Sequence, residues 1–264
     1  MPAIPIWQID AFTARPFSGN PAAVCLLDAE RDAPWMQSVA AEMNLSETAF
    51  VRRIDDGFSL RWFTPGVEVD LCGHATLASA FALWSSGAAE EHEQIRFHTR
   101  SGVLTASRDG DIILLDFPTR PASPCDPPNG LLESLGLDSP HYVGATTEDR
   151  LLVVTDAPAL RALRPDFRRL AGAAPHGVIV AAASDDPDFD FLSRFFAPAY
   201  GVDEDPVTGS AHCCLGPYWS ERLGKSDMVA RQISRRGGVV HLRARGDRVI
   251  LGGRAVPVMR GELL

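Results

Sequence analysis

The sequence predicts an α+β fold in which antiparallel strand pairing dominates. Short runs rich in β-branched, aromatic and other apolar residues recur along the chain, and most of them are too closely spaced to be joined by helices. A few helix signals lie between these runs, which separates the pattern from that of an all-β chain. The expected strands are residues 4–12, 22–27, 58–63, 111–117, 151–155, 177–183 and 248–251.

Helices are expected at four places between these strands. The first two cover residues 33–43 and 157–163, and each is opened by an Asp that is followed two residues later by a Pro. Two longer helices begin at Gly73 and at Gly209. The helix after Gly73 has small or apolar residues on every side, so we expect it to be buried all round.

Composition excludes several classes of protein. The 264 residues include 25 Lys and Arg against 34 Asp and Glu, a formal charge of −9, which argues against a nucleic-acid partner. The longest apolar run is far shorter than the roughly 20 residues that a membrane span needs. The first residues also lack the pattern of a secretory signal. We therefore expect a cytoplasmic protein with no membrane partner.

The five cysteines are expected to be free thiols, because their number is odd and a chain of this size does not need covalent cross-links. No two of them have the Cys-x-x-Cys spacing of a zinc site. His212 and Cys213 are neighbours on a helix, so their side chains point about 100° apart. No metal is expected from these spacings.

A proline-rich segment predicts a boundary between two lobes. Five prolines fall within residues 118–128, a density typical of a stiff connection rather than of a regular element. We place the N-terminal lobe at residues 1–118 and the C-terminal lobe at residues 119–253. Each is long enough to form a core of its own.

The two lobes resemble each other in sequence at one place. The pattern Arg-aromatic-Phe-small-Pro occurs at residues 61–65 and again at residues 194–198, and on this register Cys72 falls on Asp205. When the alignment is shifted by three more residues, residues 73–75 (GHA) align with residues 209–211 (GSA). This series predicts an internal duplication.

The starts of the two long helices are candidate anion sites. The first backbone N–H groups of a helix have no intrahelical acceptor, and the helix dipole adds positive charge there. Gly73 and Gly209 allow a ligand to approach the backbone, so a carboxylate is the expected ligand. Thr208 is expected to cap the second helix. Pro217 opposes the carbonyl of Cys213 and predicts a kink or an early end of that helix.

Four segments carry a resemblance to a known family. They are residues 17–24 (FSGNPAAV), 44–50 (NLSETAF), 70–76 (DLCGHAT) and 205–212 (DPVTGSAH). In this order and spacing they resemble the PhzF family, the phenazine-biosynthesis-type isomerases related to diaminopimelate epimerase and proline racemase. The resemblance implies two pseudo-symmetric lobes, each a curved, mostly antiparallel sheet or barrel around a central helix. It also implies a C-terminal strand, about residues 254–264, that returns to the first lobe.

The resemblance implies proton transfer without a cofactor and, as in many relatives, a homodimer. By this resemblance Glu47 is the principal acid/base, and His74 and Asp205 complete the catalytic group. The expected substrate contacts are Cys72, Gly73, Ala75, Gly209, Ser210 and Asn20. Racemase and epimerase relatives use two cysteines as bases, whereas here Asp205 is taken to replace the second. The expected substrate is a small molecule that bears a carboxylate.

Two other functions stay open at this point. The retained thiol of Cys72 is compatible with a racemase or epimerase that depends on it, because a helix start favours a thiolate. Buried cysteines are also common and inert. A third hypothesis is a protein that binds small acids without catalysis and keeps an old active-site cleft. Asn20 lies in a Gly-Asn-Pro turn and is either a turn residue or a substrate contact.

Overall fold

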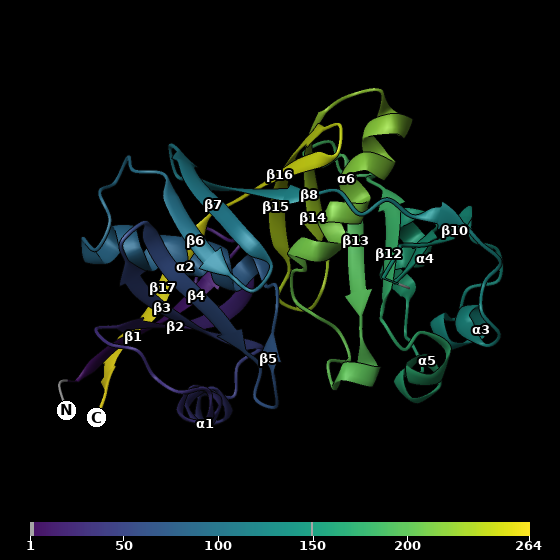
Figure 1. Cartoon of the computed structure of the whole chain (residues 1–264). Helices are drawn as coiled ribbons and strands as arrows, with labels where there is room; N and C mark the ends of the chain where they lie inside the picture. Colours follow the sequence, from purple (N-terminus) through teal and green to yellow (C-terminus); the bar gives the residue numbers. More distant parts are fainter. Residues whose placement is uncertain (1–2, 149) are drawn as a thin grey trace. The chain divides into compact units, whose positions relative to one another are not determined.

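The computed structural model describes residues 3–148 and 150–264 and confirms the α+β fold class (Figure 1). The chain forms two compact units. The first contains Met1–Phe117 and Ile250–Leu264, and the second contains Pro118–Val249. Within the described residues, every helix is too short or too polar to cross a membrane.

The first unit is a sheet whose central strands are covered by two helices. Its strands β2 and β3 are parallel, as are β4 and β6, while β1–β17, β1–β2, β3–β4, β6–β7 and β7–β8 are antiparallel. The elements are β1 (Ile4–Ala11), β2 (Asn20–Leu27), α1 (Ala33–Met43), β3 (Glu47–Ile54), β4 (Gly57–Phe63), β5 (Glu68–Val69), α2 (Gly73–Ser86), β6 (Ile95–Thr99), β7 (Gly102–Asp109), β8 (Ile112–Pro118) and the C-terminal strand β17 (Ala255–Leu263).

The second unit has the same kind of sheet. Its pairs β11–β12 and β13–β14 are parallel, while β10–β11, β12–β13 and β14–β15 are antiparallel. The elements are β9 (Ser123–Pro124), α3 (Leu131–Leu135), β10 (Tyr142–Ala145), β11 (Leu151–Val154), α4 (Ala157–Ala162), α5 (Phe167–Ala173), β12 (Val178–Ala183), β13 (Phe191–Phe196), the short 3₁₀ helix η1 (Pro198–Tyr200), α6 (Gly209–Leu223), β14 (Asp227–Gln232) and β15 (Gly238–Arg245). Strand β16 (Arg248–Gly253) carries the chain from the second unit to the first.

The strand topology confirms the expected duplication. In the first unit an antiparallel pair is followed by a helix and a parallel strand, then by a hairpin, a second helix and another parallel strand. The second unit repeats this order from β10 to β14, with α4 and α5 in the first crossover and α6 in the second. The crossover helices α2 and α6 are therefore equivalent elements.

The repeated Arg motif forms the same contact in both units. Arg61 binds Glu68 through two hydrogen bonds of 2.7 and 2.8 Å, and Arg194 binds Glu204 through two of 2.7 and 3.0 Å. Each guanidinium also lies over the Phe two residues further along, at 5.2 Å in the first unit and 4.8 Å in the second. The Arg–Glu spacing is seven residues in the first unit and ten in the second. The three extra residues therefore lie between the Arg and the Glu.

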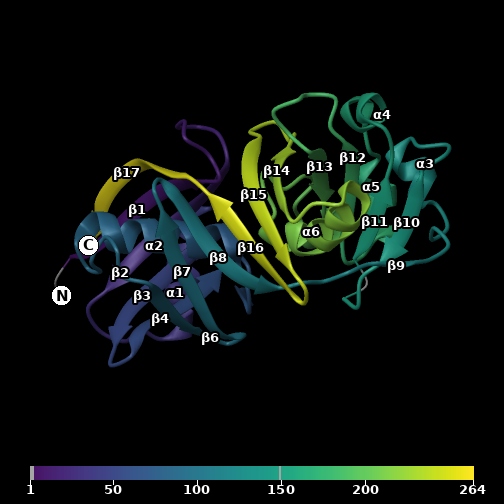
Figure 2. The ribbon, with the colours of Figure 1, turned by 90° about the horizontal axis from the view of Figure 1, so that it is seen from above.

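Side-chain alternation along the strands of the first unit separates two apolar layers. One layer contains Ala23 and Cys25 of β2, Phe50 of β3 and the apolar face of α1. Because successive strand residues point to opposite faces, the intervening residues of β2 and β3 face α2, which packs against both strands. Figure 2 shows α2 beside β1 and β2. Ten of the fourteen residues of α2 are buried, as expected for this helix.

Of the two outcomes expected at Pro217, a kink or an early end of the helix, the early end was wrong, because α6 continues to Leu223. Proline has no N–H to donate to the carbonyl four residues earlier, which here belongs to Cys213. That carbonyl instead accepts a hydrogen bond of 2.9 Å from the backbone N–H of Arg120, in the proline-rich segment. The helix therefore keeps its acceptor satisfied through a tertiary contact.

Gly19, directly before β2, allows a test of how closely the backbone packs at the start of this strand. Its φ is +66°, and a Cβ placed there would lie 2.1 Å from the carbonyl oxygen of Ala11. Gly110 has a similar φ of +59° but open space around it. Gly110→Ala should cost about 1–2 kcal/mol for the left-handed conformation alone. Gly19→Ala should lower the free energy of unfolding further, because the backbone must also shift. Denaturant midpoints that are equal for the two variants would contradict this.

His212 is a buried residue of α6 and carries no charge at neutral pH. Its Nδ1 lies 2.8 Å from the carbonyl oxygen of Thr208, so Nδ1–H donates to that oxygen. The ring stacks on Phe191 with ring centroids 6.0 Å apart. Burial lowers the pKa of His212 to about 4. Protonation of this ring is therefore coupled to unfolding.

We predict that His212 reduces stability in mild acid. Between pH 6.5 and about 4 the unfolded chain binds a proton at this position and the folded chain does not. The free energy of unfolding should therefore fall as the pH falls through this window, by up to about 3 kcal/mol. Asn can retain the donor to Thr208, so His212→Asn should fold and show a shallower dependence. Denaturation at several pH values measures both slopes. The exposed His92→Asn is the control and should leave the slope unchanged.

Candidate functional site

Two parallel strands of the first unit, β2 and β3, begin with polar residues at the same end of the sheet. Asn20 is the first residue of β2 and Glu47 is the first of β3, and the register pairs Ala22 with Glu47. Alternation places both side chains on the face that α2 covers. Their positions in the sheet thus direct an amide and a carboxyl group toward the start of that helix.

The start of α2 brings two further groups to this edge. Cys72 is the N-cap residue in an extended conformation, and the first intrahelical hydrogen bond runs from Thr76 N–H to the Cys72 carbonyl at 3.1 Å. The N–H groups of the first turn thus have no intrahelical acceptor. The sulfur of Cys72 lies beside the backbone N–H of Ala75, without the geometry of a capping hydrogen bond.

His74 is at the centre of the cluster. Its Nε2 lies 3.1 Å from Glu47 Oε2, and its Nδ1 lies 3.2 Å from Asn20 Nδ2 and 3.6 Å from Cys72 Sγ. The side chain of His74 is 7% exposed and that of Glu47 is 19% exposed. The Glu47–His74 contact is an ion pair when the ring is protonated. Among the described residues, neither Glu47 Oε2 nor His74 Nε2 has a hydrogen-bond partner.

Burial and neighbouring charges together shift the pKa values of both His74 and Cys72 upward. Burial by itself would lower the pKa of His74, but negative charge at Cys72 and at Glu47 raises it well above its usual value. Burial, and next the charge of Glu47, raise the pKa of the Cys72 thiol.

In the second unit Asp205 belongs to a different network. Thr208 is at the N-cap position of α6, as expected, but its hydroxyl donates to Asp205 Oδ2 at 2.5 Å and not to the first turn of the helix. Thr208 is the N-cap residue of α6, as Cys72 is of α2. The expected equivalence of Cys72 and Asp205 was therefore wrong. The longer loop of the second unit moves Asp205 three residues ahead of the equivalent position.

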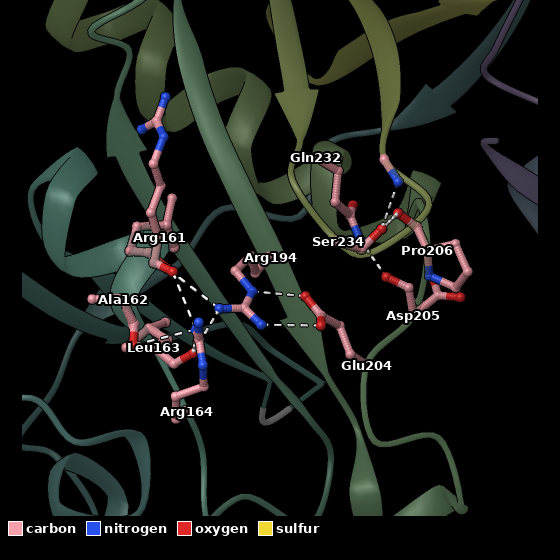
Figure 3. Close-up of polar contacts among 12 residues, drawn as sticks. Arg161, Ala162, Leu163, Arg164, Arg194, Glu204, Asp205, Pro206, Gln232 and Ser234 are labelled. Carbon is pink, nitrogen blue, oxygen red and sulfur yellow. Dashed lines mark hydrogen bonds and ion pairs between the residues drawn. The ribbon is translucent and has the colours of Figure 1, made fainter. Parts of the chain in front are cut away.

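Gln232, at the end of β14, holds this loop and was missed in the sequence. Its Oε1 accepts from the backbone N–H of Thr208 at 2.9 Å, and its Nε2 donates to the carbonyl of Asp205 at 2.7 Å. Nε2 also lies 3.2 Å from Thr208 Oγ1, which directs the Thr208 hydroxyl proton to Asp205. Ser234 binds the Pro206 carbonyl, and Arg194 holds Glu204 (Figure 3). No motif marks Gln232, because its partners lie in another segment.

Ser210, the second residue of α6, accepts a hydrogen bond from an arginine side chain. Arg150 Nη1 donates to Ser210 Oγ at 2.6 Å, and the guanidinium lies 5.8 Å from the centre of the Phe195 ring. Burial lowers the pKa of Arg150, which nevertheless stays far above neutral, so the group remains charged. A cation and a hydroxyl therefore lie at the start of α6. Sequence reasoning found Ser210 but not Arg150.

The structure brings the expected residues together in two groups. Asn20, Glu47 and residues 72–75 lie at one edge of the first unit. Asp205, Gly209 and Ser210 lie around the start of α6 in the second unit. That the two groups bind one substrate stays a prediction, as does each residue's role.

Comparison with known proteins places this geometry in a family. The family model described as phenazine biosynthesis-like protein matches residues 9–261. A relative from Halalkalibacterium halodurans, named an uncharacterized isomerase, is 52% identical over the full length of both chains. The crystal structure of a PhzF family protein from Enterococcus faecalis is 38% identical, with a TM-score of 0.93 over 99% of each chain.

A more distant structure shows the fold alone. A probable proline racemase from Agrobacterium radiobacter is 11% identical, with a TM-score of 0.64 over 99% of this chain and 93% of the other. The two-unit α+β architecture is thus shared beyond close relatives. Together with the family match along nearly the whole sequence, this shows that the chain belongs to the PhzF family of phenazine biosynthesis-like proteins.

Proposed function

We propose that this protein is a cofactor-independent isomerase that moves a proton on a small substrate bearing a carboxylate. Glu47 removes the proton from one carbon and returns it to another. The isomerase class is supported by the names of relatives at 52% and 50% identity. The acid/base assignment is supported by the geometry of the first unit.

One observation carries the assignment: Glu47 Oε2 and His74 Nε2 are inaccessible to solvent, lie 3.1 Å apart and have no hydrogen-bond partner among the described residues. Buried polar atoms are nearly always satisfied in proteins. One of these atoms belongs to the His74 ring and the other to the carboxyl group of Glu47, whose side chain is still partly exposed. A ligand that reaches Glu47 can therefore bind to these atoms through its polar groups.

His74 acts on Glu47 through its charge. A protonated ring 3.1 Å from Glu47 Oε2 is the counter-charge of the carboxylate, which is the form of Glu47 that accepts a proton from carbon. When Glu47 carries that proton, His74 loses its counter-charge, which favours return of the proton to the substrate. The Asn20 amide beside Nδ1 can present either its oxygen or its nitrogen to the ring. It therefore accommodates both protonation states of His74.

The substrate carboxylate is assigned to helix starts. The unpaired N–H groups of α2 attract an anion. In the second unit, Ser210 and the charged Arg150 offer further donors at the start of α6. We propose that Asp205, held by Thr208 and Gln232, orients another polar group of the substrate. These assignments define the substrate class by chemistry and leave its identity to experiment.

Glu47→Gln tests the central role. Incubation of the wild-type protein in D₂O with a panel of small unsaturated carboxylic acids, followed by proton NMR, identifies an isomerised acid. Glu47→Gln should then reduce turnover by about 10²- to 10⁴-fold, the usual contribution of a positioned acid/base. Binding of the acid, measured by thermal protection, should persist. The exposed Glu42→Gln is the matched control. Full activity in Glu47→Gln contradicts the mechanism, and absence of any product from a broad panel favours the binding-only hypothesis.

Cys72→Ser separates this mechanism from a thiol-dependent racemase. Because burial raises the pKa of Cys72, its thiol is a poor base at neutral pH. We therefore expect turnover of Cys72→Ser to stay within about tenfold of wild type, below the range for loss of an acid/base. Cys25→Ser, in the core of the same unit, controls for the change of sulfur to oxygen. A loss of about 100-fold or more, with deuterium at a stereocentre in the wild type only, would support the racemase instead.

A further inference from the structure

The cluster at the start of α2 contains a thiol, an imidazole and a carboxyl group, the three ligand types that zinc takes in proteins. The sulfur of Cys72, one ring nitrogen of His74 and one carboxylate oxygen of Glu47 lie within 4.8 Å of one another. Cys72 and His74 are buried, and Cys72 forms no disulfide. Glu47 keeps a partly exposed side chain, which leaves a route by which an ion can enter.

The distances fit a tetrahedral ion with small side-chain movements. A zinc ion bound to sulfur at about 2.3 Å and to nitrogen at about 2.0 Å holds these two atoms about 3.5 Å apart. Cys72 Sγ and His74 Nδ1 are already 3.6 Å apart. Glu47 Oε2 now lies beside Nε2, the other ring nitrogen, so the Glu47 side chain must rotate to bring an oxygen to an ion bound at Nδ1. Asn20, now beside Nδ1, would give way to the ion if Nδ1 is the nitrogen that binds.

We propose that Cys72, His74 and Glu47 form a site for a soft divalent cation, of which Zn²⁺ is the best match, and that the bound ion inhibits the enzyme. Sulfur and nitrogen ligands favour Zn²⁺ over Mg²⁺ or Ca²⁺. On binding, the ion loses water ligands, the thiol proton and the extra proton of the His74 ring pass to solvent, and sulfur–metal and nitrogen–metal bonds form without any change of oxidation state. Three protein ligands leave a fourth position for water.

Inhibition follows from the identity of the third ligand. A carboxylate bound to the metal cannot accept a proton from carbon, and an imidazole bound to it cannot remain charged. The inhibitory part of the proposal rests on the proposed function, whereas the metal site itself does not. Binding is therefore tested first, without any substrate.

The test uses Co²⁺ as a spectroscopic substitute for Zn²⁺ on the full chain. Titration of the wild-type protein should produce a saturable sulfur-to-cobalt charge-transfer absorption at one equivalent, and Zn²⁺ should remove it by displacement. Cys72→Ser should abolish the band and weaken Zn²⁺ binding, measured by calorimetry, by at least about tenfold. The exposed thiol variant Cys125→Ser is the matched control and should retain both.

The outcomes either support or overturn the site. No band in the wild type, a band that persists in Cys72→Ser, or one that disappears in Cys125→Ser would overturn it. His74→Asn is a second variant in case Cys72→Ser does not fold, which circular dichroism would reveal, and it should weaken Zn²⁺ binding as strongly. With an isomerised acid in hand, Zn²⁺ should stop turnover and EDTA should restore it. Zn²⁺ binding without inhibition would overturn the inhibitory role alone, and failure to find any isomerised acid would leave the binding result intact.

Discussion

The enclosure of α2 by apolar strands is the constraint on which the site of the first unit depends. A helix with small and apolar residues on every side is stable only when the sheet surrounds it, and this fixes where its first turn lies. The parallel strands β2 and β3 begin at that same place. Their first residues, Asn20 and Glu47, therefore meet His74 at the start of the helix. A site placed on regular elements in this way is held rigidly.

Burying polar side chains at such a position lowers the free energy of unfolding. In the first unit these side chains are gathered in one cluster at the start of α2. Ion pairs that leave water pay a desolvation penalty that their mutual attraction only partly offsets. Here the pair Glu47–His74 also leaves two buried atoms without hydrogen bonds among the described residues. Local violations of this kind gather at functional sites, because a ligand can satisfy what the protein does not. The same features explain why the cluster suits both a proton transfer and a metal ion.

The duplicated scaffold has diverged where the two helices begin. Both units retain the bidentate Arg–Glu pair over a Phe and the same order of parallel and antiparallel strands. In the first unit the strands below the helix begin with Asn20 and Glu47, whereas β11 and β12 begin with Leu151 and Val178. Three extra residues in the second unit create the loop in which Thr208 and Gln232 hold Asp205. The scaffold thus places different side chains at equivalent helix starts.

The sequence by itself determined the fold class, the duplication and the helix of residues 33–43, and it marked both long helix starts. These features depend on apolar periodicity and on residues such as Asp32 and Pro34, whose effects act over one or two turns of chain. The short helix α3 lacked such signals, and Asp166, which caps α5, was not recognised in the sequence. Family motifs supplied Glu47 and His74, but not their contact.

Tertiary structure alone decided the contacts between distant segments. Asn20 and His74 are 54 residues apart in sequence, and Thr208 and Gln232 are 24 apart. Arg120 satisfies the carbonyl that Pro217 leaves free, and α6 continues past this proline to Leu223. The physical reason is the same in each case: strand register and helix burial set these distances, and both are properties of the packed chain rather than of neighbouring residues.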